Sequence, residues 1–181
     1  MYAHWDYIDI VVNQKFNITE YFKEFDNSLN IKKYKIEKID MDLSSGKTSK
    51  AKAKISKKGV LTVSKEGLIR VTPLVKDGKK YVPVEGIEPY VLNVVKPGVL
   101  KKIKTVPESE ITVNDLITNF PANSNTVKLS IPKKTKVATY DEQNNSVKLI
   151  KKGKVKITVT ITNIQGNSVK YSCTVNCKLK P

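Results

Sequence analysis

Few residues in this sequence have the types and spacing that catalysis requires. His4 is the only histidine, so a Ser-His-Asp or Cys-His arrangement would have to use it. Its position near the N-terminus indicates a tail residue instead of a catalytic base. The eight glycines are isolated turn residues and form no phosphate-binding loop. We therefore predict no catalytic residue and no cofactor, and we expect a protein that is not an enzyme.

Two cysteines, Cys173 and Cys177, are four residues apart on a stretch that we predict to be one strand. Their Cα atoms should then be about 13 Å apart, whereas a disulfide needs about 4.4–6.8 Å. We interpret them as two small buried apolar residues. A metal pair and an intermolecular disulfide are the alternatives. No His/Cys cluster has the spacing of a zinc site.

Three small acidic groups are the remaining candidates for ion binding. They are Asp40 with Asp42, Asp141 with Glu142, and the cluster of Glu20, Glu24 and Asp26. Either of the first two pairs could contact Ca²⁺, but calcium takes six to eight oxygen ligands. We interpret all three groups as solvated, turn or capping residues, and we predict no metal site.

Lysine gives the chain its charge. The formal net charge is +16, and Arg70 is the only arginine among 33 basic residues. Specific readers of phosphate or guanine edges prefer arginine, so we expect no specific nucleic-acid partner. Lysines on the wet faces of strands favour solubility and protection of sheet edges. The alternative is a polyanion-binding face, for which the candidate residues are Lys154, Lys156, Lys170, Lys178 and Lys180.

Four tyrosines offer a second binding hypothesis. Tyr81, Tyr90, Tyr140 and Tyr171 could form a platform for a glycan if their rings were exposed. Core packing with a hydrogen-bonded hydroxyl is the interpretation that we favour.

The stretch from Lys151 to Leu179 has the clearest pattern. Val155, Ile157, Val159 and Ile161 alternate with lysine and threonine, the turn signal NIQGN follows, and a second alternating run leads to Leu179. Strict alternation predicts one buried and one wet strand face. The whole stretch therefore predicts a β-hairpin in an antiparallel sheet.

The order of such signals indicates that one pattern occurs twice. TVNDLITNF echoes NITEYFKEF, KKG at 151–153 corresponds to KEG at 65–67, and each Lys-Gly turn precedes a long alternating run. A repeat at about 85–95 residues predicts tandem copies of one domain. We predict domains at 1–97 and 98–181, each with six to eight short strands, which is typical of a β-sandwich. The fold class that we expect is all-β, as two tandem immunoglobulin-like antiparallel β-sandwiches.

The second half of each predicted domain resembles the bacterial immunoglobulin-like domain, group 2 (BIG2). The matching segments are Val137-Ala138, 147–149, Gly153 and 157–160 in the second domain, and 59–63, Gly67 and 69–72 in the first. The front halves depart from the family pattern, since no Trp-Ser-Ser run precedes the Val-Ala strand. The resemblance implies a bacterial cell-surface or secreted protein without a shared catalytic site.

From these features we expect a non-enzymatic structural or adhesive module that spaces or presents other domains. The alternative is a module that binds glycan or anionic cell-wall polymer through lysine-rich strand faces. The expected partners are cell-wall polymer, acidic glycan or a host surface protein. No apolar run approaches the roughly 20 residues of a membrane-spanning helix. The resemblance implies an extracellular or bacterial cell-surface location, with signal and anchor outside these residues.

Overall fold

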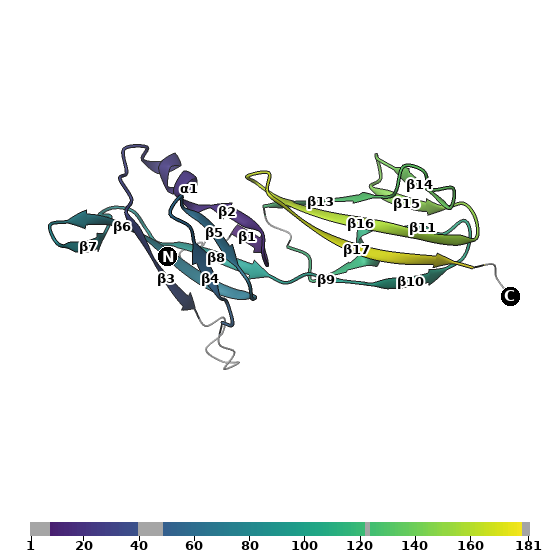
Figure 1. The fold of residues 1–181 in the computed structure, drawn as a ribbon, viewed down its shortest axis with the longest axis horizontal. Coiled ribbons are helices and arrows are strands. Elements are labelled where there is room, and N and C mark those ends of the chain that lie inside the picture. Colours follow the sequence, from purple (N-terminus) through teal and green to yellow (C-terminus); the bar gives the residue numbers. More distant parts are fainter. Residues whose placement is uncertain (1–7, 40–48, 122–123, 179–181) are drawn as a thin grey trace, which may run out of the picture. The chain divides into compact units, whose positions relative to one another are not determined.

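The computed structural model describes residues 8–39, 49–121 and 124–178, and most of them lie in strands (Figure 1). The fold is an all-β sandwich, as the alternating sequence predicts. The chain forms two compact units. Unit 1 comprises Met1–Lys96 and Pro121–Ser124, and unit 2 comprises Pro97–Phe120 and Asn125–Pro181. Their assignment as two tandem immunoglobulin-like domains stays a prediction.

The described residues of unit 1 form two sheets and one helix. Their elements are β1 (Ile8–Val11), β2 (Lys15–Asn17), α1 (Ile18–Phe25), β3 (Lys33–Ile39), β4 (Ala53–Ile55), β5 (Val60–Val63), β6 (Gly67–Asp77), β7 (Lys80–Pro83) and β8 (Tyr90–Val95). The larger sheet has the order β1-β8-β6-β3, and β7 pairs with β6 beyond the end of β8. The smaller sheet has the order β2-β5-β4.

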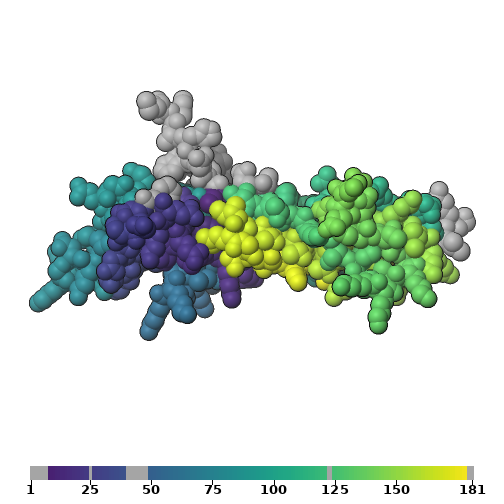
Figure 2. Space-filling view, turned by 90° about the horizontal axis from the view of Figure 1, so that it is seen from above, coloured from purple at the N-terminus to yellow at the C-terminus, as the bar shows by residue number. Residues whose placement is uncertain are grey.

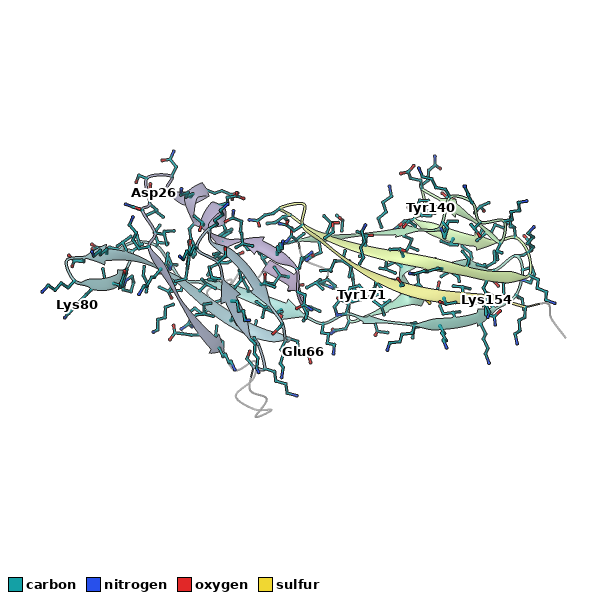
Figure 3. All side chains as sticks on the ribbon, viewed as in Figure 1. Asp26, Glu66, Lys80, Tyr140, Lys154 and Tyr171 are labelled. Atoms are coloured by element: carbon teal, nitrogen blue, oxygen red, sulfur yellow. The ribbon has the colours of Figure 1, made fainter. Side chains whose placement is uncertain are left out.

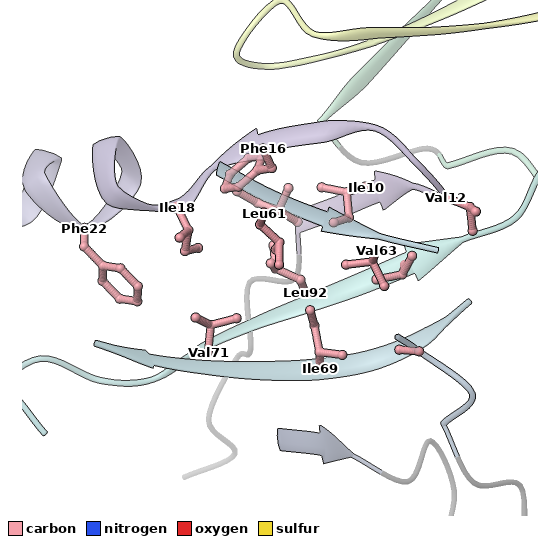
Figure 4. Close-up of a cluster of buried hydrophobic side chains, with 13 residues drawn as sticks. Ile10, Val12, Phe16, Ile18, Phe22, Leu61, Val63, Ile69, Val71 and Leu92 are labelled. Carbon is pink, nitrogen blue, oxygen red and sulfur yellow. The ribbon is translucent and has the colours of Figure 1, made fainter. Parts of the chain in front are cut away.

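The core of unit 1 lies between these two sheets, as the close-up of its apolar side chains shows (Figure 4). Ile69 and Val71 come from the larger sheet, and Phe16 and Leu61 come from the smaller one; all four are at most 1% exposed. Each large apolar side chain that is buried in this way stabilises the fold by about 1.5–3 kcal/mol. The first turn of α1 adds Ile18 to the cluster.

Unit 2 has a similar layout, with a longer last strand. Its elements are β9 (Gly98–Val99), β10 (Lys102–Thr105), β11 (Glu110–Ile111), α2 (Val113–Leu116), β12 (Ile117–Thr118), β13 (Asn125–Ser130), β14 (Ala138–Asp141), β15 (Ser146–Leu149), β16 (Gly153–Asn163) and β17 (Ser168–Cys177). The four-stranded sheet has the order β10-β17-β16-β13, and the three-stranded sheet has the order β11-β15-β14. The short strands β9 and β12 pair with each other.

Strand pairing follows the same order in both units. In each unit an early strand pairs parallel with the last one, as β1 does with β8 and β10 does with β17. The 11-residue strands β6 and β16 each begin at a glycine and lie antiparallel to that last strand. The segments NITEYFKEF and TVNDLITNF contain α1 and α2, whose N-caps are Asn17 and Thr112, and the second segment also contains β12.

Pro73 lies inside β6, although proline is normally found at strand ends and edges because it has no backbone N–H. β8 pairs with Gly67–Val71 of β6, and β7 pairs with Leu74–Asp77. Pro73 therefore stands close to where β6 changes its partner on one side, so its missing N–H interrupts neither ladder. On the other side its Cα partner is Tyr34 of β3.

Candidate anion-binding face

The alternation predicted for residues 151–179 places lysines on the outer face of the four-stranded sheet of unit 2. Val155, Ile157, Val159 and Ile161 of β16 are buried, and Lys154 and Lys156 between them are exposed. The outer positions of β17 are occupied by serine, threonine, asparagine and Lys170, while Cys173, Val175 and Cys177 face the core. One face of the hairpin is thus apolar and the other is basic and hydroxyl-rich. The hairpin lies at the molecular surface, where it is yellow in Figure 2.

The pairing of β10, β17 and β16 brings four lysines of this sheet close together. Thr174 of β17 is the partner of Lys102 on one side and of Lys156 on the other, and Asn176 stands in the same way between Lys104 and Lys154. We call Lys102, Lys104, Lys154 and Lys156 the Lys quartet. Strands lie about 4.8 Å apart and alternate residues about 6.8 Å apart. The four Cα atoms therefore form a rectangle of about 10 by 7 Å.

A shallow recess of about 570 Å³ lies where β16 begins and β17 ends. Lys152, Lys154 and Lys178 line it, together with Gly153 and Asn176. Lys154 marks this end of the sheet in Figure 3. Three ammonium groups around one concave surface attract an anion, because cations that share a site repel one another until a counter-charge binds.

The four strands of this sheet contain six lysines and no aspartate or glutamate. We call their outer face, with the recess, the basic sheet face. Among the residues described, Lys128 of β13 is the one lysine of these strands with an ion pair, to Glu142 at 2.9 Å. That contact raises the pKa of Lys128. The strands of the three-stranded sheet, by contrast, contain both signs of charge, with Glu110 and Asp141 beside Lys148.

The structure describes four of the five lysines that we predicted for polyanion binding. The structure places Lys154, Lys156 and Lys170 on the basic sheet face and Lys178 in the recess. The fifth, Lys180, lies outside the described residues. The prediction missed Lys102, Lys104 and Lys152. The alternation in KKIKTV marks Lys102 and Lys104 as wet, but a parallel pairing over about 70 residues of chain sets their neighbours.

The four predicted tyrosines come from two units and, within unit 2, from two sheets. Tyr140 of β14 and Tyr171 of β17 belong to different sheets of unit 2 (Figure 3), and both are half-buried. The Tyr140 hydroxyl donates to Asn145 Oδ1 at 3.1 Å, and burial raises the pKa of the Tyr171 hydroxyl. In unit 1, the Tyr90 ring packs against Tyr21, with centroids 4.0 Å apart.

Two of the other candidate residues, Asp141 and Asp26, accept hydrogen bonds within turns. The Asp141 carboxylate accepts from the backbone N–H groups of Gln143 and Asn144, which with the Asn144 side chain lowers its pKa. Asp26 accepts from Ser28 in a similar turn. The pair Asp40 and Asp42 and the residue His4 lie outside the described residues. Within the described ranges, no group of three His, Cys, Asp or Glu side chains is placed to hold a metal ion.

Both cysteines are free thiols on the inner side of β17. Burial raises the pKa of each thiol, because the thiolate would lose its hydration there. In the part of the chain that the structure describes, no helix has the length and apolar character needed to cross a membrane.

Comparisons with known proteins leave the family open. No family model matches this sequence, and no curated protein matches it in sequence. The resemblance to group 2 bacterial immunoglobulin-like domains therefore stays a prediction.

Among solved structures, Drosophila N-cadherin EC1-4 matches at TM-score 0.32 and 13% identity, over 80% of this chain and 42% of that chain. The human desmocollin-1 ectodomain matches at 0.32 and 9%, over 82% and 34%. Chicken VE-cadherin EC1-2 matches at 0.28 and 13%, over 98% of both chains. This chain thus spans less than half the length of the first two. TM-scores this low carry no inference about family or function, and the fold assignment depends on the sheets described above.

Proposed function

We propose that this chain is a non-enzymatic adhesive module that holds an anionic polymer on the basic sheet face of unit 2. One observation carries the proposal: six lysines and no acidic residue lie in the four strands of one sheet. An ordinary solvated surface mixes both signs of charge, as the strands of the three-stranded sheet of the same unit do.

The chemistry of lysine defines the class of ligand. An ammonium group is a hydrated point charge that accepts many geometries, whereas a fixed planar recognition site uses arginine. Lysines repeated across four strands therefore favour an extended polymer that carries many carboxylates, phosphates or sulfates. Acidic glycans and anionic cell-wall polymers have this chemistry. Each exposed contact is weak, so affinity comes from several contacts at once.

The setting that we propose is a bacterial cell-surface or secreted protein, in which two tandem immunoglobulin-like domains of the group 2 type space or present other domains. The repeated strand order of the two units supports this arrangement. A host surface protein with an acidic patch would use the same face.

The experiment is binding of the 181-residue chain to an array of anionic and neutral glycans, at low and at physiological salt. Saturable binding that prefers anionic glycans and survives physiological salt supports the proposal. Binding that is absent, or that disappears at physiological salt, overturns it and leaves a plain spacing role.

A further inference from the structure

A second recess lies in unit 1, where the edges of its two sheets face each other. Strand β3 ends the order of the larger sheet, and β4 ends that of the smaller one. The recess has a volume of about 510 Å³, within the usual range of about 300–1,000 Å³ for small-molecule sites. We call it the edge recess.

The inner lining of the edge recess is apolar. Ile31, Tyr34, Ile36 and Ile55 line it, and each is half-buried and packs against the core of unit 1. Because the core holds one side of each residue, these side chains present a fixed apolar surface to the recess.

Two hydroxyl groups lie within this apolar lining. The hydroxyls of Tyr34 and Thr19 hydrogen-bond to each other. Burial raises the pKa of the Tyr34 hydroxyl, which therefore stays a neutral donor and acceptor at physiological pH. The lining thus offers hydrogen-bonding groups beside the apolar surface.

Ser56 and a group of lysines make up the rest of the lining. Four exposed lysines, Lys32, Lys33, Lys57 and Lys58, line the recess, and none of the described lining residues is acidic. The ammonium group of Lys33 lies over the ring of Tyr81, 4.1 Å from its centroid. Lys32, Lys57 and Lys58 are therefore the cations best placed for a ligand.

From these contacts we propose that the edge recess binds an acidic sugar, namely a pyranose ring that carries a carboxylate or a sulfate. The C–H face of the ring packs on the isoleucines, and its hydroxyls bond to the hydroxyls of Tyr34 and Thr19. The acidic group pairs with Lys57, Lys58 and Lys32. A simple anion would leave the apolar lining unused, and a neutral sugar would leave the lysines unused. The inference stands apart from the basic sheet face, because the two sites belong to different units.

The test is an amide NMR titration of the ¹⁵N-labelled chain. The probes are a disaccharide of glucuronic acid and N-acetylglucosamine, N-acetylglucosamine 6-sulfate, neutral N-acetyllactosamine and sodium sulfate. We expect saturable shifts at residues 31–36 and 55–58 with at least one acidic sugar, and much smaller shifts there with the neutral sugar or sulfate. The two acidic probes distinguish a carboxylate ligand from a sulfated one.

Paired variants provide the control. The double variant Lys57→Gln/Lys58→Gln should weaken acidic-sugar binding about tenfold, since two charge contacts are lost. Lys79→Gln/Lys80→Gln removes the same charge at the β6–β7 hairpin, where Figure 3 labels Lys80, and should change affinity by less than about twofold. Absent shifts at the recess, equal response to neutral sugar or sulfate, or equal affinity of both double variants overturns the proposal.

Discussion

Replacement of Gly153 by alanine tests how the basic sheet face is held in place. Gly153 is the first residue of β16, lies in the recess, and has φ of +151°. A Cβ atom built on it would lie 2.6 Å from Cγ2 of Val137, which real side chains do not tolerate without movement. Gly67 begins β6 in the same way, with φ of +136° and Ser49 as the obstructing neighbour.

The magnitude follows from two separate costs. A positive φ at a residue with a side chain costs about 1–3 kcal/mol, and the overlap with Val137 costs about a further 1–3 kcal/mol. We expect Gly153→Ala to lower the free energy of unfolding by about 2–6 kcal/mol. Gly166→Ala is the matched control, because its φ is +76° and no atom lies within 4 Å of the added Cβ. It should cost only the backbone strain, about 1–2 kcal/mol.

The assay is urea denaturation followed by far-UV circular dichroism. A double-mutant cycle with Val137→Ala, which removes the obstructing methyl groups, should recover about 1–3 kcal/mol of the Gly153→Ala cost. The reasoning is refuted if Gly153→Ala costs no more than Gly166→Ala, or if the Val137→Ala background recovers nothing.

Three further predictions concern unit 2 and the pH dependence of the whole chain. Asn145→Ala removes hydrogen bonds to the Leu129 N–H, the Val127 carbonyl and the Tyr140 hydroxyl. It should lower the free energy of unfolding by about 2–3 kcal/mol in a urea titration. A loss below about 1 kcal/mol would contradict these contacts. Because burial raises the pKa of both thiols and of the Tyr34 and Tyr171 hydroxyls, the unfolded chain loses these protons first. The free energy of unfolding should therefore be constant just below about pH 8.5 and fall as the pH rises above it. Melting temperatures that show no decline between pH 7 and 11 would exclude this linkage. Cys173 and Cys177 should resist maleimide in the folded chain and react with it in urea, and mass spectrometry would detect the added mass. Rapid labelling without denaturant would show that β17 does not bury the two thiols.

Local patterns in the sequence predicted the strands and their faces. The alternation in β16 and β17 follows directly from the period of a strand, so the exposure of Lys154, Lys156 and Lys170 was predictable. The Asp-Gly pair at 77–78, a sequence that favours a hairpin turn, lies where β6 connects to β7. The immunoglobulin-like tandem repeat remains a prediction that the shared strand order supports.

These local patterns could not predict which distant strands lie side by side. Lys102 and Lys104 join Lys154 and Lys156 only because β10 pairs with β17, a contact that no local period encodes. The edge recess was missed for the same reason, since Lys32–Ile36 and Ile55–Lys58 belong to different sheets and meet through the core of unit 1. Pro73 alone would favour a strand end, and only the change of partner from β8 to β7 along β6 accommodates it inside the strand.

The central claim is that the basic sheet face binds a polyanion, and the most direct measurement is the salt dependence of heparin affinity for three proteins. They are the parent chain, the quadruple Lys→Gln variant of the Lys quartet, and a matched quadruple variant at Lys133, Lys134, Lys136 and Lys151, which are exposed residues outside these strands. Each charge contact contributes roughly one to the slope of log affinity against log salt. The account predicts that the quartet variant loses about three to four from the magnitude of that slope, and that the matched variant loses less than about one. Equal slopes for the two variants would show that binding follows net charge alone, and would contradict the account.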